Sequence, residues 1–155
     1  AKMALGLGMK VIAADSFIDK VDVKVEFFDG QSVTTTIISQ SLESLFKEAD
    51  FISLHVPAQN GYIISAAELA TMKDGVGIVN CARGGVIDEI ALIDALDSGK
   101  VGFAGLDVFE SEPKPEMRIL MHQKISLTPH IGAATGEAQD RIGTELAQQI
   151  ISILG

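Results

Sequence analysis

The sequence predicts an α/β domain built on a doubly wound parallel sheet. Short apolar runs recur along the chain, at Met9–Ala14, Phe51–His55, Val76–Asn80, Val101–Leu106 and Ile125–Thr128. These runs are apolar on both faces rather than alternating, which is typical of strands buried on both sides. Helical segments lie between them, and strands that alternate with helices indicate a doubly wound α/β domain.

The first helical segments have recognisable ends. Leu42–Glu48 predicts a short helix before the second run. Ser65 is followed three residues later by Glu68, which is a capping box at the start of a helix. We expect that helix to end near Asp74-Gly75, because glycine readily closes a helix.

Two further helices follow. Asp88 is a good N-cap, and Gly99 lies where the helix that follows Asp88 should stop. The last helix is predicted over about residues 136–154. Its apolar residues recur at three- and four-residue steps and predict one stripe that packs inward; they are Ile142, Leu146, Ile150 and Ile153.

One stretch breaks the alternation of strands and helices. Val23–Phe28 and Gln31–Ile38 flank Asp29-Gly30, a dipeptide typical of tight hairpin turns. Residues 23–38 therefore predict a β-hairpin at an edge or on the surface of the domain.

Composition limits the partners and the compartment. The chain has 155 residues, enough for one domain with a core. Its 12 basic and 21 acidic residues give a net charge of −9, which argues against nucleic acid or an anionic membrane as a partner. Cys81 is the single cysteine, and no signal pattern or membrane-spanning apolar run is present. We therefore expect a cytoplasmic protein without a metal site.

Unusual residues follow the predicted strands, where α/β sheets bind their ligands. Arg83 follows one run in "NCARGG", Glu112 follows the next in "LDVFESEP", and His130 follows the last in "TPHIGAAT". Arg binds carboxylates with two parallel hydrogen bonds, and imidazole exchanges a proton near neutral pH. Each residue alone also fits a solvated loop or a structural role. Together they predict one cleft suited to oxidation of a 2-hydroxy acid beside a nicotinamide.

Asp15 ends the first apolar run. An acid there can accept hydrogen bonds from both ribose hydroxyls of an adenosine. No Arg follows within the next four residues to bind a 2′-phosphate, so NAD is favoured over NADP. A solvated acid at a strand end is the alternative for this residue taken alone.

Four stretches carry a resemblance to a known family: "ADFISLHVP", "LATMKDGVGIVNCARGGVIDEIALIDAL", "GKVGFAGLDVFESEP" and "LTPHIGAATGEAQDRIG". They resemble the Rossmann-fold NAD-binding domain of the D-isomer-specific 2-hydroxyacid dehydrogenases, over roughly residues 1–22 and 41–155. Within this family, the motifs are most similar to the D-3-phosphoglycerate dehydrogenases of serine biosynthesis.

The resemblance implies an NAD-dependent oxidoreductase of small D-2-hydroxy acids, with 3-phosphoglycerate as the first candidate substrate. Glyoxylate or hydroxypyruvate reduction is the alternative within the family. A different alternative is an NAD-sensing, non-catalytic interaction protein similar to the corepressors that share this fold. The family also implies a homo-oligomer formed through this domain.

The resemblance also implies roles for individual residues. Arg83 would bind the carboxylate and the 2-oxygen of the substrate, and His130 would remove the hydroxyl proton. Glu112 would pair with His130 and favour its protonated form for the reverse reaction. Asp107 would contact the nicotinamide carboxamide. The residues that would bind the cofactor are Asp15, Val56, Cys81, Ala82, Arg83, Asp107, His130, Ile131, Gly132 and Ala133.

Two features depart from the family pattern. The fingerprint G-x-G-x-x-G should follow a strand, with its acid about 20 residues further on. Gly6 and Gly8 instead precede the first run and lie nine and seven residues before Asp15, so they fit the end of a helix. We therefore expect residues 1–155 to be a partial NAD-binding domain without the first strand, the Gly-rich loop or a substrate domain. Such a chain should be inactive alone and bind NAD weakly.

Overall fold

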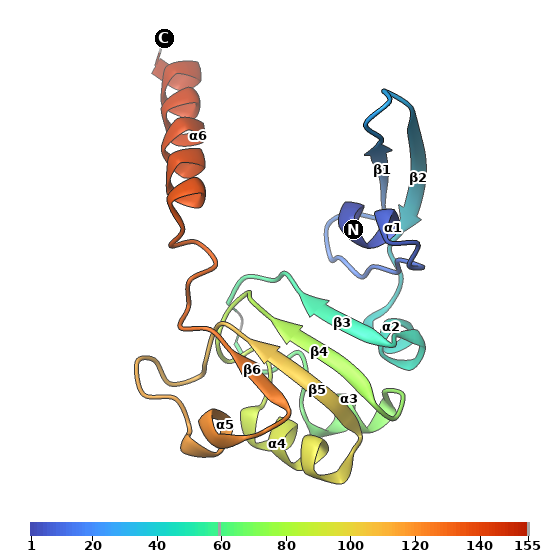
Figure 1. Cartoon of the computed structure of the whole chain (residues 1–155), viewed down its shortest axis with the longest axis vertical. Helices are drawn as coiled ribbons and strands as arrows, with labels where there is room; N and C mark the ends of the chain where they lie inside the picture. Colours follow the sequence, from blue (N-terminus) through green and yellow to red (C-terminus); the bar gives the residue numbers. More distant parts are fainter. Residues whose placement is uncertain (59, 155) are drawn as a thin grey trace.

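A parallel sheet of four strands forms the centre of the computed structural model, which describes residues 1–58 and 60–154 (Figure 1). The strands lie side by side in chain order; they are β3 (Phe51–Leu54), β4 (Val76–Asn80), β5 (Val101–Leu106) and β6 (Ile125–Leu127). The predicted α/β fold with a parallel sheet is confirmed. β3 and β6 each end one residue earlier than predicted.

The predicted helix starts are also confirmed. α2 (Leu42–Glu48) begins after Ser41, and α3 (Ala66–Thr71) begins with the predicted capping box of Ser65 and Glu68. α3 ends earlier than the predicted Asp74-Gly75, because the backbone of Met72 is already extended.

α4 and α5 complete the helices around the sheet. α4 (Glu89–Ser98) begins with the Asp88 side chain accepting from the Ala91 amide, and Gly99 ends it with a φ of 82°. α5 (Met117–Met121) was not predicted. It has five residues and no side-chain N-cap, so the sequence offers neither periodicity nor a start signal for it.

The helices cover one face of the sheet. Figure 1 shows α3, α4 and α5 on the same side of it, as same-handed crossovers between consecutive parallel strands require. The core lies between these helices and the sheet, and Ile78, Leu92 and Ile119 in it are 0% exposed. On the opposite face Phe51 is 59% and Phe103 45% exposed. The prediction that the strands are buried on both sides is therefore wrong for β3 and β5.

The first apolar run, Met9–Ala14, does not form the predicted strand. Its backbone makes one isolated parallel bridge, from Ala13 to Ser39, and the Gln40 amide donates to the Ala13 carbonyl at 2.9 Å. A strand needs a continuous ladder of such bonds. This run meets the chain that leaves the hairpin at a single position, so no ladder forms.

The glycines that precede this run end a helix, as predicted. α1 (Lys2–Gly6) is followed by Gly8 with a φ of 77°. The Gly8 amide donates to the Leu5 carbonyl and the Met9 amide to the Ala4 carbonyl, at 2.9 and 3.0 Å. These two bonds form a Schellman motif, in which a left-handed residue satisfies the last helical carbonyls.

The predicted hairpin is present. β1 (Lys20–Glu26) pairs antiparallel with β2 (Ser32–Ile38), and the connecting turn has Gly30 at a φ of 84°. β1 begins three residues before the predicted Val23, because its partner is long enough to pair back to Lys20. Figure 1 shows this hairpin extending away from the four-stranded sheet.

The last helix, α6 (Gly136–Leu154), has the predicted extent but not the predicted packing. It projects away from the sheet (Figure 1), and Ala138 is its one buried residue in the part of the helix that the structure describes. The predicted stripe is 47–80% exposed, from Ile150 to Ile153. Among the described residues, no helix combines the length and apolarity needed to cross a membrane.

Candidate functional site

The loops that follow β4, β5 and β6 are bonded to one another. The Asp107 amide donates to the Asn80 carbonyl, and the Thr128 amide donates to the Leu106 carbonyl, both at 3.0 Å. These bonds continue the sheet beyond its strands. They bring the segments that carry Arg83, Glu112 and His130 to one edge of the sheet, as the sequence predicted.

His130 and Glu112 form a direct pair. His130 Nδ1 lies 2.7 Å from Glu112 Oε2, and the Phe109 amide donates to Glu112 Oε1 at 3.0 Å. The bond with His130, together with that amide, holds the pKa of the Glu112 carboxyl below its ordinary value. The carboxylate fixes the orientation of the imidazole through Nδ1, so Nε2 is the ring nitrogen that can face a ligand.

Asp107 shapes the turn that carries His130. This carboxylate is 2% exposed and accepts from the Thr128 hydroxyl and from the amides of Ile131 and Gly132, the amides at 2.9 Å. Burial opposes its ionisation, but these three donors outweigh burial and hold its pKa below the ordinary value. His130 itself has a φ of 56°, a backbone state that such a bonded turn can maintain.

Asn80 and Gly84 position the loop that carries Arg83. The Asn80 side chain is 3% exposed; it accepts from the Ala82 amide and donates to the Arg83 carbonyl, both at 3.0 Å. Gly84 lies so close to the Phe109 carbonyl that a side chain there would collide with the backbone. The Arg83 side chain is exposed and folds back to donate from Nη1 to the Ala82 carbonyl at 2.6 Å.

Two glutamates join the segments that follow β4 and β5 through reciprocal hydrogen bonds. Glu89 Oε1 accepts from the Glu110 amide at 2.8 Å, and Glu110 Oε1 accepts from the Glu89 amide at 2.9 Å. Tyr62 donates to the other Glu110 oxygen at 3.3 Å. Glu89 is 7% exposed, and burial raises the pKa of its carboxyl.

The sequence did not indicate that the side chains of Asn80 and Glu89 hold the loops at this edge of the sheet in place. Glu89 and Glu110 are 21 residues apart, and no local pattern predicts which amide each carboxylate will meet. The usable signal was the strand-ending position of Asn80, since a polar residue there caps the turn that follows.

The other residues predicted to bind the cofactor differ in burial and in their place in the fold. Val56 is partly buried against the core, Cys81 is exposed and Ala82 is buried. Ile131, Gly132 and Ala133 lie in the turn after His130. Asp15 belongs to the N-terminal segment, where its Oδ1 accepts from the amides of Phe17 and Ile18 at 2.8 and 3.1 Å. Within residues 1–58 and 60–154, no hydrogen bond joins Asp15 to the loops of the sheet edge.

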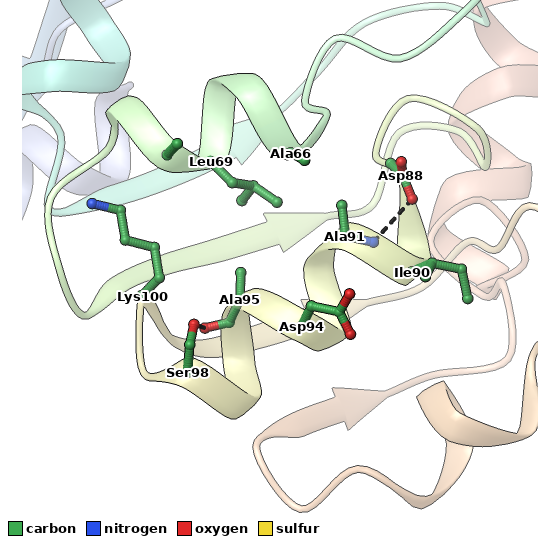
Figure 2. Close-up of a pocket in the computed structure, with 10 residues that line it drawn as sticks. Ala66, Leu69, Asp88, Ile90, Ala91, Asp94, Ala95, Ser98 and Lys100 are labelled. Carbon is green, nitrogen blue, oxygen red and sulfur yellow. Dashed lines mark hydrogen bonds between the residues drawn. The ribbon is translucent and has the colours of Figure 1, made fainter.

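Among the hollows of the described surface, two differ in the chemistry of their walls. One, of about 380 Å³, borders His130 and Glu112 and has apolar walls from Phe109, Leu120 and Leu127. The other, of about 440 Å³, lies between α3 and α4 (Figure 2). Its walls are mainly small apolar side chains, and the Asp88 carboxylate on its rim is already used to cap α4. The first hollow is therefore the candidate ligand site, and of the predicted catalytic residues it is lined by Glu112 and His130 but not by Arg83.

Comparison with known proteins finds a family model and several relatives that this chain matches. Residues 1–132 match the family model described as "D-isomer specific 2-hydroxyacid dehydrogenase, NAD binding domain". A hydroxypyruvate reductase of Thermotoga maritima is 49% identical over the whole chain, and a D-3-phosphoglycerate dehydrogenase of Synechocystis is 40% identical over 99% of it. This chain covers 48% and 26% of those two proteins.

A solved structure agrees with the match. The D-lactate dehydrogenase of Aquifex aeolicus, in complex with NAD and lactic acid, is 32% identical with a TM-score of 0.71. The likeness covers 98% of this chain and 48% of that one. The family match, the parallel sheet and the loops at its edge agree with one another. The chain therefore belongs to the NAD-binding domain family of the D-isomer-specific 2-hydroxyacid dehydrogenases.

Proposed function

We propose that the protein containing this domain oxidises a small D-2-hydroxy acid with NAD, and reduces the matching 2-oxo acid with NADH. The observation that carries the proposal is the His130–Glu112 pair, 2.7 Å apart, at a sheet edge that also carries Arg83. Bound NAD would supply the hydride chemistry by accepting a hydride from C2 of the substrate.

The three residues would divide the remaining work. Arg83, an exposed residue, would bind the substrate carboxylate in two parallel hydrogen bonds. This requires it to leave the Ala82 carbonyl that it now contacts. His130 would take the hydroxyl proton on Nε2, leaving a 2-oxo acid. Glu112, ionised through most of the working pH range, would stabilise the imidazolium that forms.

The cofactor would lie across the same edge. We propose the cofactor contacts at Val56, at Cys81 to Arg83 and at His130 to Ala133, with Asp15 on the adenosine ribose. Both oxygens of Asp107 already accept hydrogen bonds from the chain, so its proposed contact with the nicotinamide carboxamide would use a remaining lone pair.

Two kinds of substrate are candidates, one with a phosphate group and one without. 3-Phosphoglycerate is supported by the motifs "NCARGG" and "LDVFESEP" and by the relative from Synechocystis. Hydroxypyruvate or glyoxylate is supported by the relative from Thermotoga maritima, which has the higher identity. The phosphate group distinguishes 3-phosphoglycerate from hydroxypyruvate and glyoxylate, because a site that binds it needs cationic groups to balance its negative charge.

The test is turnover by the full-length protein, with NADH and a panel of 3-phosphohydroxypyruvate, hydroxypyruvate, glyoxylate and pyruvate. The His130→Gln variant should lose about 10²- to 10⁴-fold in kcat, the usual contribution of a positioned acid–base group. His122 offers a matched control, since it also lies beside a carboxylate, Asp97, at 3.3 Å, but outside this edge. The His122→Gln variant should retain activity. No turnover of any 2-oxo acid would refute the proposal.

Glu112→Gln tests the role of the carboxylate separately. Its lowered pKa keeps Glu112 ionised, and an ionised partner favours the protonated imidazole that reduction consumes. As the pH rises, the variant should therefore lose reductase activity at a lower pH than the wild type. A pH profile of kcat that the substitution leaves unmoved would exclude this role for Glu112.

A further inference from the structure

β1 has an outer edge that pairs with no other strand in the described part of the chain, and this edge has an ordered charge pattern. β1 reads Lys-Val-Asp-Val-Lys-Val-Glu from Lys20 to Glu26, so charged residues and valines alternate between its two faces. β1 and β2 form a two-stranded sheet, so β2 occupies only one edge of β1. All four charged residues of β1 are exposed.

The hydrogen bonds of the hairpin tell which backbone groups face outward. Phe27 donates to the Gln31 carbonyl and Ser39 donates to the Asp19 carbonyl, at 2.9 and 2.8 Å, so the odd-numbered residues bond to β2. In an antiparallel ladder, alternate residues bond to opposite sides. The even-numbered residues therefore direct their amides and carbonyls to the outer edge; they are Lys20, Asp22, Lys24 and Glu26.

We propose that this edge pairs antiparallel with the same edge of a second copy of the chain, around a twofold axis at Val23. In that register Lys20 lies opposite Glu26 of the second copy, and Asp22 lies opposite its Lys24. Each outward-bonding residue then meets another outward-bonding residue. The register that satisfies the backbone is thus also the one that pairs every charge with its opposite.

Neighbouring registers of the two β1 strands fail either on charge or on backbone hydrogen bonding. Moving one strand by two residues in one direction places Asp22 opposite Asp22, and in the other direction places Lys24 opposite Lys24. Moving it by one residue puts outward-bonding residues opposite residues that are already bonded to β2. Charges on an edge strand normally prevent association. Here the same charges oppose the two-residue shifts, and the bonding pattern of the backbone excludes the one-residue shifts.

Pairing would also correct a weakness of the hairpin. A two-stranded sheet is marginally stable by itself, whereas three or more strands with an apolar face can be stable. The dimer would have the order β2–β1–β1–β2 and join the valine faces, with Val21 opposite Val25 and Val23 opposite itself. The edge of β2 is less suited to pairing, because Ser39 and Gln40 already contact Ala13.

Intrachain contacts do not compete strongly with this arrangement. Lys24 lies 2.9 Å from Glu26, and Lys2 of α1 lies 3.8 Å from Glu26. Both pairs join side chains that are 57–58% exposed, and such pairs contribute little stability. α1 lies against β1, but no backbone hydrogen bond joins the two among the described residues.

Sedimentation velocity of the whole chain over a concentration series tests the pairing. We expect a dimer whose dissociation constant rises about tenfold or more in Lys24→Glu, because two attractive pairs become repulsive. The double variant Asp22→Lys with Lys24→Asp exchanges the charges and should restore dimerisation. Lys47→Glu changes the net charge equally on exposed α2 and should have no effect. A monomeric wild type, or a dimer indifferent to Lys24→Glu, would overturn the proposal.

A crosslink tests the register. In a Cys81→Ser background, Val23→Cys would place two thiols opposite each other at a non-hydrogen-bonded position, with Cα atoms about 4.5 Å apart, within disulfide reach. Val21→Cys is the matched control, because the two copies of that residue would lie about 13 Å apart. We expect an oxidised dimer from the first variant and monomer from the second. Equal crosslinking of both, or of neither, would contradict this register.

Discussion

The loops at the sheet edge and the N-terminal hairpin segment are stabilised in different ways. Near β4 and β5, the polar side chains of Asn80 and Asp107 are buried and hydrogen-bonded, and they lie next to the hydrophobic core. In residues 1–40, Ile37 is the one buried residue, and its neighbours are held mainly by the β1–β2 ladder. The loops are therefore stabilised by the hydrophobic core beneath them, whereas the hairpin segment is stabilised mainly by the pairing of its own strands.

Truncating one isoleucine in each region should make this difference measurable. Ile78→Ala removes a fully buried side chain from β4 and should cost about 2–5 kcal/mol of unfolding free energy. Ile37→Ala should lower the global stability much less, while the hairpin amides exchange faster with solvent. Thermal unfolding combined with hydrogen exchange distinguishes the two. Equal losses of global stability would mean that the chain unfolds as one unit.

A single methyl group should disrupt the sheet edge. Gly84→Ala would force a side chain into the Phe109 carbonyl and should cost roughly 3 kcal/mol, since the backbone must move. Gly143→Ala is the matched control in α6. That position has open space, and alanine should stabilise the helix by about 0.5–1 kcal/mol. Denaturant unfolding of both variants gives the comparison; a harmless Gly84→Ala would show that the two loops are not held tightly together.

Two aspartates test the same contrast without changing size. Asp107→Asn would place the NH2 of the new side chain against the backbone N–H of Ile131 or Gly132, so that two donors face each other. This should cost about 2 kcal/mol of unfolding free energy. Asp15→Asn keeps an oxygen for both amides that Asp15 now binds, so its effect should stay below about 0.5 kcal/mol. Similar effects in chemical denaturation would contradict the difference between the regions.

The smallest expected effect concerns pH. Burial raises the pKa of Glu89. Ionisation of this carboxyl therefore opposes folding once the pH rises above the ordinary pKa of a glutamate. Glu89→Gln should therefore gain stability relative to the wild type between acidic and neutral pH. Glu68 is the opposite case, because its bonds to Ser65 lower its pKa. Glu68→Gln should lose relative stability over the same interval. Melting temperatures against pH would show the two trends diverging.

Local signals predicted the elements well where they were strong. The capping box at Ser65, the N-cap at Asp88 and the closing Gly99 each act within a few residues, so the sequence reveals them. Met9–Ala14 was predicted as a strand and is not one, because strand formation needs a partner that no local pattern specifies. α6 has the predicted length for local reasons, but its apolar stripe is exposed in the described part of the chain.

The sequence alone predicted the family, the α/β class and a set of candidate residues that follow the strands. These depend on motifs and on the periodicity of short segments. The family resemblance already implied that Glu112 pairs with His130. The hydrogen bonds of Asp107 to the turn beside His130, and those between Glu89 and Glu110, are visible only in the folded chain, and they join residues 24 and 21 positions apart. They form because parallel strands bring distant loops to one edge, a juxtaposition that chain packing creates.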